Sequence, residues 1–104
     1  MVNPLAGEVE IIIDGVAHRC KLTLGAMAEL EGALGTDSLL DLVARFEAGN
    51  FSSRDVMALV VAGLRGGGWT GSAADLMTAD IAGGAVGAAQ AAATMLVRAF
   101  TPPA

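Results

Sequence analysis

The dipeptide Asp14-Gly15 constrains the fold of this chain more than any other part of its sequence. It lies between two runs in which apolar and polar residues alternate, and an Asp-Gly pair in this setting is the strongest short-range signal of a two-residue hairpin turn. The turn predicts a β-hairpin over residues 8–24 and fixes the register of its two strands. The expected partners are Ile13 with Val16, Ile11 with His18, Val9 with Cys20, Glu10 with Arg19 and Glu8 with Lys21.

The predicted hairpin has one charged face and one apolar face. On the charged face Glu8 and Glu10 lie opposite basic residues, and each such pair stabilises a hairpin by about 0.2–1 kcal/mol. An isolated hairpin is only marginally stable, so the apolar face is expected to pack against helices. The residues expected on the apolar face are Val9, Ile11, Ile13, Val16, Cys20, Leu22 and Leu24.

The spacing of apolar residues changes after Thr23 from two to about 3.6, which predicts helices for the rest of the chain. Two helices should follow one another here, because capping and stop residues bracket two apolar stripes. The expected caps and stops are, in chain order, Thr23, Gly35, then Thr36 or Asp37, and finally Gly49-Asn50.

A Ser-x-x-Asp pattern, the acidic variant of a capping box, occurs twice in the second half of the chain. At Ser52 it predicts a third helix over about residues 53–65, and at Ser72 it predicts a short fourth helix that extends toward Ile81. A final helix is expected over about residues 85–100. The residues expected to face inward in the five helices are Leu24, Met27, Leu30, Leu34, Leu39, Leu42, Val43, Phe46, Val56, Met57, Val60, Val61, Leu64, Leu76, Met77, Val86, Ala89, Ala93, Leu96 and Phe100.

The length of 104 residues predicts one domain spanning residues 1–104. The expected fold class is α+β and mostly helical, with an N-terminal β-hairpin (about 8–24) followed by four to five short α-helices. Residues 1–6 and 101–104 are expected to be frayed, because neither end belongs to a predicted element.

Charge and composition exclude several classes of partner. The net charge is −5 and the six basic residues are scattered, which argues against nucleic acid and against an anionic membrane surface. No apolar run reaches the length of a membrane-spanning helix, and the N-terminus lacks the pattern of a signal peptide. We therefore expect a cytoplasmic protein that binds neither nucleic acid nor membrane.

The sequence holds no constellation typical of an enzyme. His18 and Cys20 are the only histidine and the only cysteine, and they point the same way from one strand, but no third group is placed to orient them. The glycines at 66–68 lack the Lys-Ser/Thr of a phosphate-binding loop, so they are interpreted as a helix stop and a flexible joint. We expect no catalytic residues, no metal and no cofactor.

Four residues are candidates for contact with a partner protein: Trp69, Met57, Met77 and Met95. Trp is enriched among residues that dominate binding energy, and Met adapts to varied apolar surfaces. The alternatives stay open, because Trp69 could instead hold the last helices onto the core and the methionines could fill it. The final helix, rich in Gly and Ala, could pack within the domain or against a second protein.

The chain resembles the small proteins encoded beside the tail genes of gene transfer agents, which are phage-like particles of alphaproteobacteria. The resemblance covers about residues 7–100, and its most specific part is the segment TLGAMAELE at residues 23–31, followed by DVMALVVAGLRG at 55–66. That family is grouped with tail assembly chaperones and is also labelled a tail tube protein. It has no catalytic residues to carry over.

The resemblance implies a non-enzymatic tail assembly chaperone that binds the tape-measure protein and recruits tail tube subunits in the bacterial cytoplasm. A first alternative is a structural tail tube component that stays in the particle. In either role, assembly of the chain as a homo-oligomer stays open. Tube subunits are built from large sheets, and one hairpin is too little strand for such a wall, which favours the chaperone. A second alternative is a small helical adaptor unrelated to phage.

Overall fold

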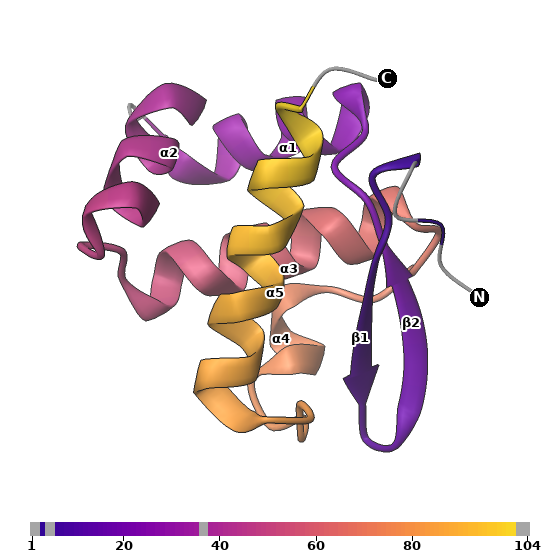
Figure 1. Cartoon of the computed structure of the whole chain (residues 1–104). Coiled ribbons are helices and arrows are strands. Elements are labelled where there is room, and N and C mark those ends of the chain that lie inside the picture. Colours follow the sequence, from indigo (N-terminus) through magenta and orange to yellow (C-terminus); the bar gives the residue numbers. More distant parts are fainter. Residues whose placement is uncertain (1–2, 4–5, 36–37, 102–104) are drawn as a thin grey trace.

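A β-hairpin followed by five helices makes up the described part of the chain, which in this computed structural model comprises residues 3, 6–35 and 38–101. The predicted α+β, mostly helical class is confirmed (Figure 1). The elements in chain order are β1 (Val9–Ile13), β2 (Val16–Cys20), α1 (Leu24–Leu34), α2 (Leu39–Ala48), α3 (Ser53–Gly66), α4 (Ala73–Leu76) and α5 (Gly84–Ala99).

Parts of the prediction fall on residues that the structure does not describe. The expected caps Thr36 and Asp37 are among them, and the N-cap of α2 is Ser38, whose hydroxyl accepts from the Asp41 N–H at 3.1 Å. Of the two ends expected to be frayed, residues 1–2, 4–5 and 102–104 also lie outside the described part.

The hairpin has the register that its turn predicts. Asp14 and Gly15 have φ of 50° and 79°, as a turn with two left-handed residues requires. Four of the five predicted Cα pairs, from Ile13 with Val16 to Val9 with Cys20, are confirmed, and the fifth, Glu8 with Lys21, lies beyond the paired residues. The charge pairing differs, because Arg19 forms its ion pair diagonally with Glu8, at 3.9 Å.

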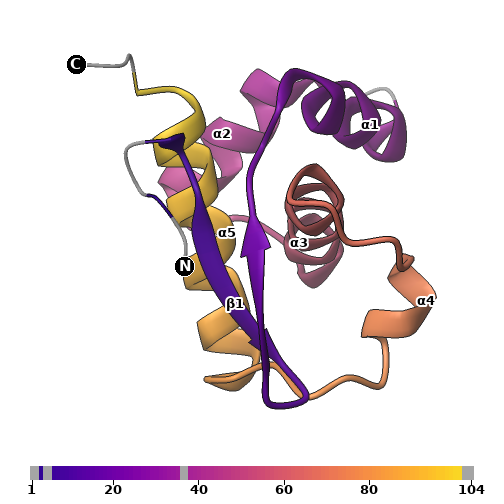
Figure 2. The same ribbon diagram turned by 90° about the vertical axis from the view of Figure 1, so that its right-hand side faces the viewer.

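Several residues expected to face inward are instead exposed. Val16 is 57% exposed because the turn end of the hairpin projects beyond α3 (Figure 2). Leu24 is 82% exposed, since Ala26 and Leu30 are the residues that α1 buries. In the later helices the same error affects Met77, Val86 and Phe100.

Ile81 forms a bridge to β1 instead of extending α4. It pairs antiparallel with Ile13, while the Asp14 N–H donates to the Asp80 carbonyl at 2.7 Å and the Ala82 N–H donates to the Ile12 carbonyl at 3.0 Å. These bonds satisfy backbone groups on the outer edge of β1 that a two-stranded sheet leaves free. The predicted helical extension to Ile81 is therefore wrong.

Helix α3 lies at the centre of the molecule and contacts α1, α4, α5 and β2 (Figure 2). It is therefore buried on more than the one face that its pattern predicts. Leu59 and Ala62 are buried beside the expected Val60 and Leu64. The core around α3 is completed by Val9, Ile11, Ile13, Cys20, Leu22, Ala26, Leu30, Leu42, Leu76, Ala92, Met95 and Leu96.

The C-terminal end of α3 touches the end of β2 through glycines. The Lys21 N–H donates to the Gly63 carbonyl at 2.9 Å. A Cβ atom at Gly66 would lie 2.0 Å from the Lys21 carbonyl oxygen, and one at Gly67 would lie 1.9 Å from that of Arg19. Gly66 and Gly67 are thus points of close backbone contact, and their interpretation as a flexible joint is wrong.

Replacing Gly67 with Ala should lower the free energy of unfolding by about 1–3 kcal/mol, because the new methyl group pushes the Arg19 backbone away from α3. The matched control is Gly32→Ala in α1, where a Cβ meets nothing within 4 Å and φ is not positive. That change should be neutral or stabilise by up to about 1 kcal/mol. Urea unfolding followed by circular dichroism measures both, and equal effects would contradict the close contact.

Candidate partner-binding site

An apolar groove of about 240 Å³ opens at the surface between α3, α4 and α5. Ser53 is the one residue with a polar side chain in its lining. The other lining residues are Phe51, Val56, Met57, Val60, Leu76, Ile81, Ala85, Ala88 and Ala89. Pockets of this kind, apolar and open, are typical of surfaces that take up side chains of a ligand or a partner.

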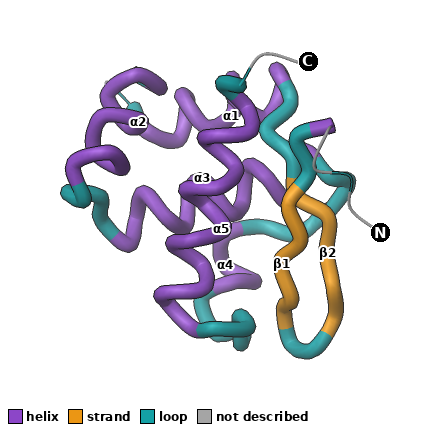
Figure 3. The backbone as a smooth tube through the Cα atoms, viewed as in Figure 1, coloured by secondary structure: helices purple, strands orange, loops and turns teal. Residues whose placement is uncertain are grey.

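The α5 wall of the groove is made of alanines, and this leaves room for a partner's larger side chains. A sharp turn leads into α5 (Figure 3), and Gly83 and Gly84 in this turn have φ of 82° and 63°. At Gly87 a Cβ would lie 2.3 Å from the Ala82 carbonyl oxygen, so this first turn is packed against its own entry segment. Small residues therefore form both this wall of the groove and the turn that leads into it.

Phe51 closes the end of the groove nearest α2. Its ring stacks on that of Phe46 with centroids 4.4 Å apart and planes 9° from parallel. Phe51 immediately precedes the N-cap Ser52, and Val56 is the fourth residue of α3, so the two occupy the positions of a hydrophobic staple. Both line the groove, which places the start of α3 and the aromatic stack at the same site.

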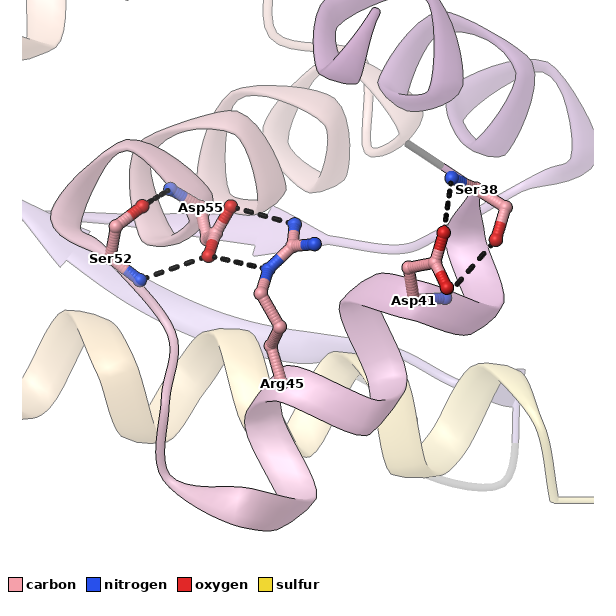
Figure 4. Close-up of polar contacts among 5 residues, drawn as sticks. All are labelled: Ser38, Asp41, Arg45, Ser52 and Asp55. Atoms are coloured by element: carbon pink, nitrogen blue, oxygen red, sulfur yellow. Dashed lines mark hydrogen bonds and ion pairs between the residues drawn. The ribbon is translucent and has the colours of Figure 1, made fainter. Parts of the chain in front are cut away.

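A buried carboxylate fixes the start of α3 beside α2 (Figure 4). Asp55 accepts from Arg45 Nε at 3.0 Å and Nη2 at 2.9 Å, and from the Ser52 N–H at 2.9 Å. The Asp55 N–H donates back to the Ser52 hydroxyl at 3.1 Å, completing the predicted capping box. Bidentate pairing of this kind sets orientation as well as charge, so the clamp holds α2 and α3 at a defined angle.

The clamp also determines the ionisation of Asp55. Burial raises the pKa of this carboxyl, but the hydrogen bonds from Arg45 and Ser52 and the charge of Arg45 outweigh burial and hold the pKa below its usual value. The exposed Asp41, in the equivalent box of α2, has a lowered pKa because of its hydrogen bonds to Ser38. Asp55 is therefore charged at neutral pH although it is almost fully buried.

The four predicted contact residues do not gather at one place. Met57 lines the groove, whereas Met77 is 74% exposed and is not part of its lining. Met95 is fully buried on the inner side of α5, where its sulfur lies against Gly63. Trp69 is half-buried against the core, with its ring over Gly71.

The sequence reasoning missed most residues of the groove. A signal for Phe51 was available, because an aromatic residue directly before a capping box marks a staple. No comparable signal marks Ala85, Ala88 and Ala89, whose contribution is their small size. Ile81 was missed because it was assigned to a helix.

The only histidine and cysteine lie away from this groove. Cys20 is fully buried, and burial raises the pKa of its thiol to about 12, which leaves it protonated and unreactive at neutral pH. Among the residues described, no three His, Cys, Asp or Glu side chains lie close enough together to hold a metal ion. None of the described helices is both long and apolar enough to cross a membrane.

Comparison with known protein families finds a match over most of the chain. A family model described as phage tail tube protein, GTA-gp10, matches residues 6–101. No curated protein and no solved structure shows a significant match to the chain. The family match agrees with the resemblance to gene transfer agents and leaves no support for an adaptor unrelated to phage.

Replacing Asp55 with Asn should lower the free energy of unfolding at pH 7 by about 1–3 kcal/mol, because the partly buried ion pair between Arg45 and this carboxylate is lost. The carboxylate stabilises the fold above its unfolded pKa, near 3.9, and this contribution is lost as pH falls through the lowered folded pKa. The difference between wild type and variant should therefore shrink below about pH 4.

Urea unfolding at a series of pH values tests this. Asp41→Asn is the matched control, since Asp41 occupies the same capping position without such a buried ion pair, and its effect at pH 7 should be smaller. Equal losses in the two variants, or a wild-type advantage that persists unchanged at low pH, would contradict the role given to the Arg45–Asp55 pair.

Proposed function

Because the chain belongs to the family described as phage tail tube protein, GTA-gp10, we propose that it acts without enzymatic activity in building the tail of a gene transfer agent. The proposed role is that of a tail assembly chaperone, which binds the tape-measure protein and brings tail tube subunits to it. This takes place in the bacterial cytoplasm, before the particle is complete.

The observation that carries the chaperone role is the apolar groove between α3, α4 and α5. A tape-measure protein is a long helical chain whose apolar stripe needs cover before the tail forms. A groove with aliphatic and methionine walls accepts such a stripe in the helix-in-groove mode. Met57 suits this role because its flexible thioether adapts to different side chains along the target.

The small amount of strand supports the same role. The described sheet consists of β1 and β2, with five residues each, and is extended only by the bridge at Ile81. A tube wall built from stacked sheets needs more strand than this. One face of this short hairpin is already occupied, because α5 contacts β1 and α3 contacts β2.

The family's description favours a second candidate, a structural component of the tail tube. In this role the protein stays in the finished particle. The two candidates differ in stoichiometry, so mass spectrometry of purified particles and of pull-downs from lysate separates them. A chaperone is found with the tape-measure protein in lysate and is absent from particles, whereas a tube component is present in many copies per particle.

Filling the groove should weaken binding of the tape-measure protein. Ala85→Phe places a large side chain in the groove from an exposed position, and it should lower the affinity for a co-expressed tape-measure fragment by about tenfold or more. Leu40→Asp is the control, because Leu40 is exposed on α2 and lies outside the groove. The readout is the amount of fragment that stays soluble and co-purifies.

Two further variants test the other predicted contact residues. Met77→Asp and Trp69→Ala leave the groove lining intact. If either folded variant loses the fragment while Ala85→Phe retains it, the binding surface lies around α4 and not in the groove.

A further inference from the structure

A second apolar groove, of about 220 Å³, opens where α1 lies alongside α3 (Figure 2). We refer to it as the α1–α3 groove. Of its lining residues only Met57 also lines the groove between α3, α4 and α5. Ala33 and Ala58 bring small side chains to its walls, which leaves room for larger side chains of a partner. Two lining residues, Glu29 and Arg54, are charged, and all the others are apolar.

The two charged residues of the α1–α3 groove differ in their partners. The Glu29 carboxylate forms an ion pair with Arg65 Nε at 2.6 Å, so its charge is already matched. Within the part of the chain that the structure describes, the Arg54 side chain has neither an ion pair nor a hydrogen bond. The neighbouring carboxylate, Asp55, is held by Arg45 of α2 at 2.9 Å. Arg54 is therefore the unmatched charge of this groove, and it is positive.

The position of Arg54 does not favour the helix to which it belongs. Arg54 is exposed and is the second residue of α3, after Ser53. The N-terminal turn of a helix carries a partial positive charge, so basic side chains there are unfavourable and acidic ones are favourable. The stability of the described fold thus gives no reason for a basic residue at this place. A local conflict of this kind indicates that the residue serves a partner.

We propose that the α1–α3 groove binds an amphipathic helix of another protein, and that Arg54 pairs with a carboxylate beside the apolar stripe of that helix. Arg54, Met57 and Val61 follow one another at steps of three and four residues, so they lie along one side of α3. Met57 and Val61 contact the apolar stripe in the helix-in-groove mode, and Arg54 lies one turn further toward the start of α3. The unmatched positive charge selects an acidic helix over a basic or uncharged one.

Helix α5 of a second copy does not fit this description. Its exposed apolar residues Val86 and Val97 have no carboxylate beside them, because no charged residue occurs from Ile81 to Val97. The inference goes beyond the proposed function and does not rest on it, since the tape-measure segment is assigned to the groove between α3, α4 and α5. A chaperone that joins two proteins needs two surfaces, and the α1–α3 groove supplies the second.

Binding of two synthetic helical peptides to the full chain tests the proposal. The peptides share one apolar stripe and differ in a single residue beside it, which is Glu in one and Lys in the other. At low salt the wild type should bind the Glu peptide about threefold or more tighter in fluorescence anisotropy, and Arg54→Glu should reverse this preference. Arg19→Glu is the matched control, because it makes the same change of charge at an exposed residue of β2 outside the groove, and it should leave the preference unchanged.

Further measurements on the same protein separate binding from folding and one groove from the other. Arg54→Glu should unfold at the same or a higher urea concentration than the wild type, because an acidic residue suits the first turn of α3. Ala33→Phe, at an exposed position of the lining, should weaken binding of the Glu peptide by about tenfold or more. Ala85→Phe, which fills the other groove, should leave it unchanged, so a failure of the chaperone role does not affect this test.

The proposal is overturned if neither peptide binds at millimolar concentration, or if the wild type and Arg54→Glu show the same preference. A wild-type dimer that Arg54→Glu dissociates, seen by sedimentation equilibrium, would also overturn it, because the groove would then belong to a second copy of the chain.

Discussion

The close contact between β2 and the C-terminal half of α3 is the constraint from which the arrangement of the other elements follows. A backbone hydrogen bond from Lys21 to Gly63 joins them, and the absence of side chains at Gly66 and Gly67 lets the two backbones approach. Once α3 lies against the hairpin, α1 must cover one of its sides, because α1 starts directly after β2. Helix α5 covers another side and contacts β1.

The two ends of α3 are held by different kinds of chemistry. Steric contact between backbones fixes the C-terminal end, and the Arg45–Asp55 pair with its capping box fixes the N-terminal end. A buried ion pair adds little net stability but specifies geometry, since its partners are satisfied in one arrangement only. The groove lies along a helix whose position is thus set at both ends.

Local signals predicted much of this fold. A two-residue turn leaves one register for the hairpin, and each Ser-x-x-Asp box fixes a helix start within a few residues, as at Ser52. Orientation of the helices was less predictable. The spacing of apolar residues puts Leu24 and Val86 on the predicted inner stripes, but Ala26 and Ala88 are among the residues that these helices bury. The bridge at Ile81 consists of one residue pair, and no alternation of apolar and polar residues marks it in the sequence. The groove is formed by three segments that are separate in the sequence. Its alanine wall could not be predicted, because alanines occur on every side of α5.

The alanines of α5 affect the packing of this helix on two of its sides. On its inner side Ala88 and Ala92 let it lie close to α3, and on the adjacent side Ala85 and Ala89 leave the groove open. A helix with so few large residues gains little from burying Val86 and Val97 in its own domain. Those side chains therefore stay at the surface, 67% and 66% exposed. On the proposed function, the same helix would hold a tape-measure segment on the side where its alanines leave the groove open.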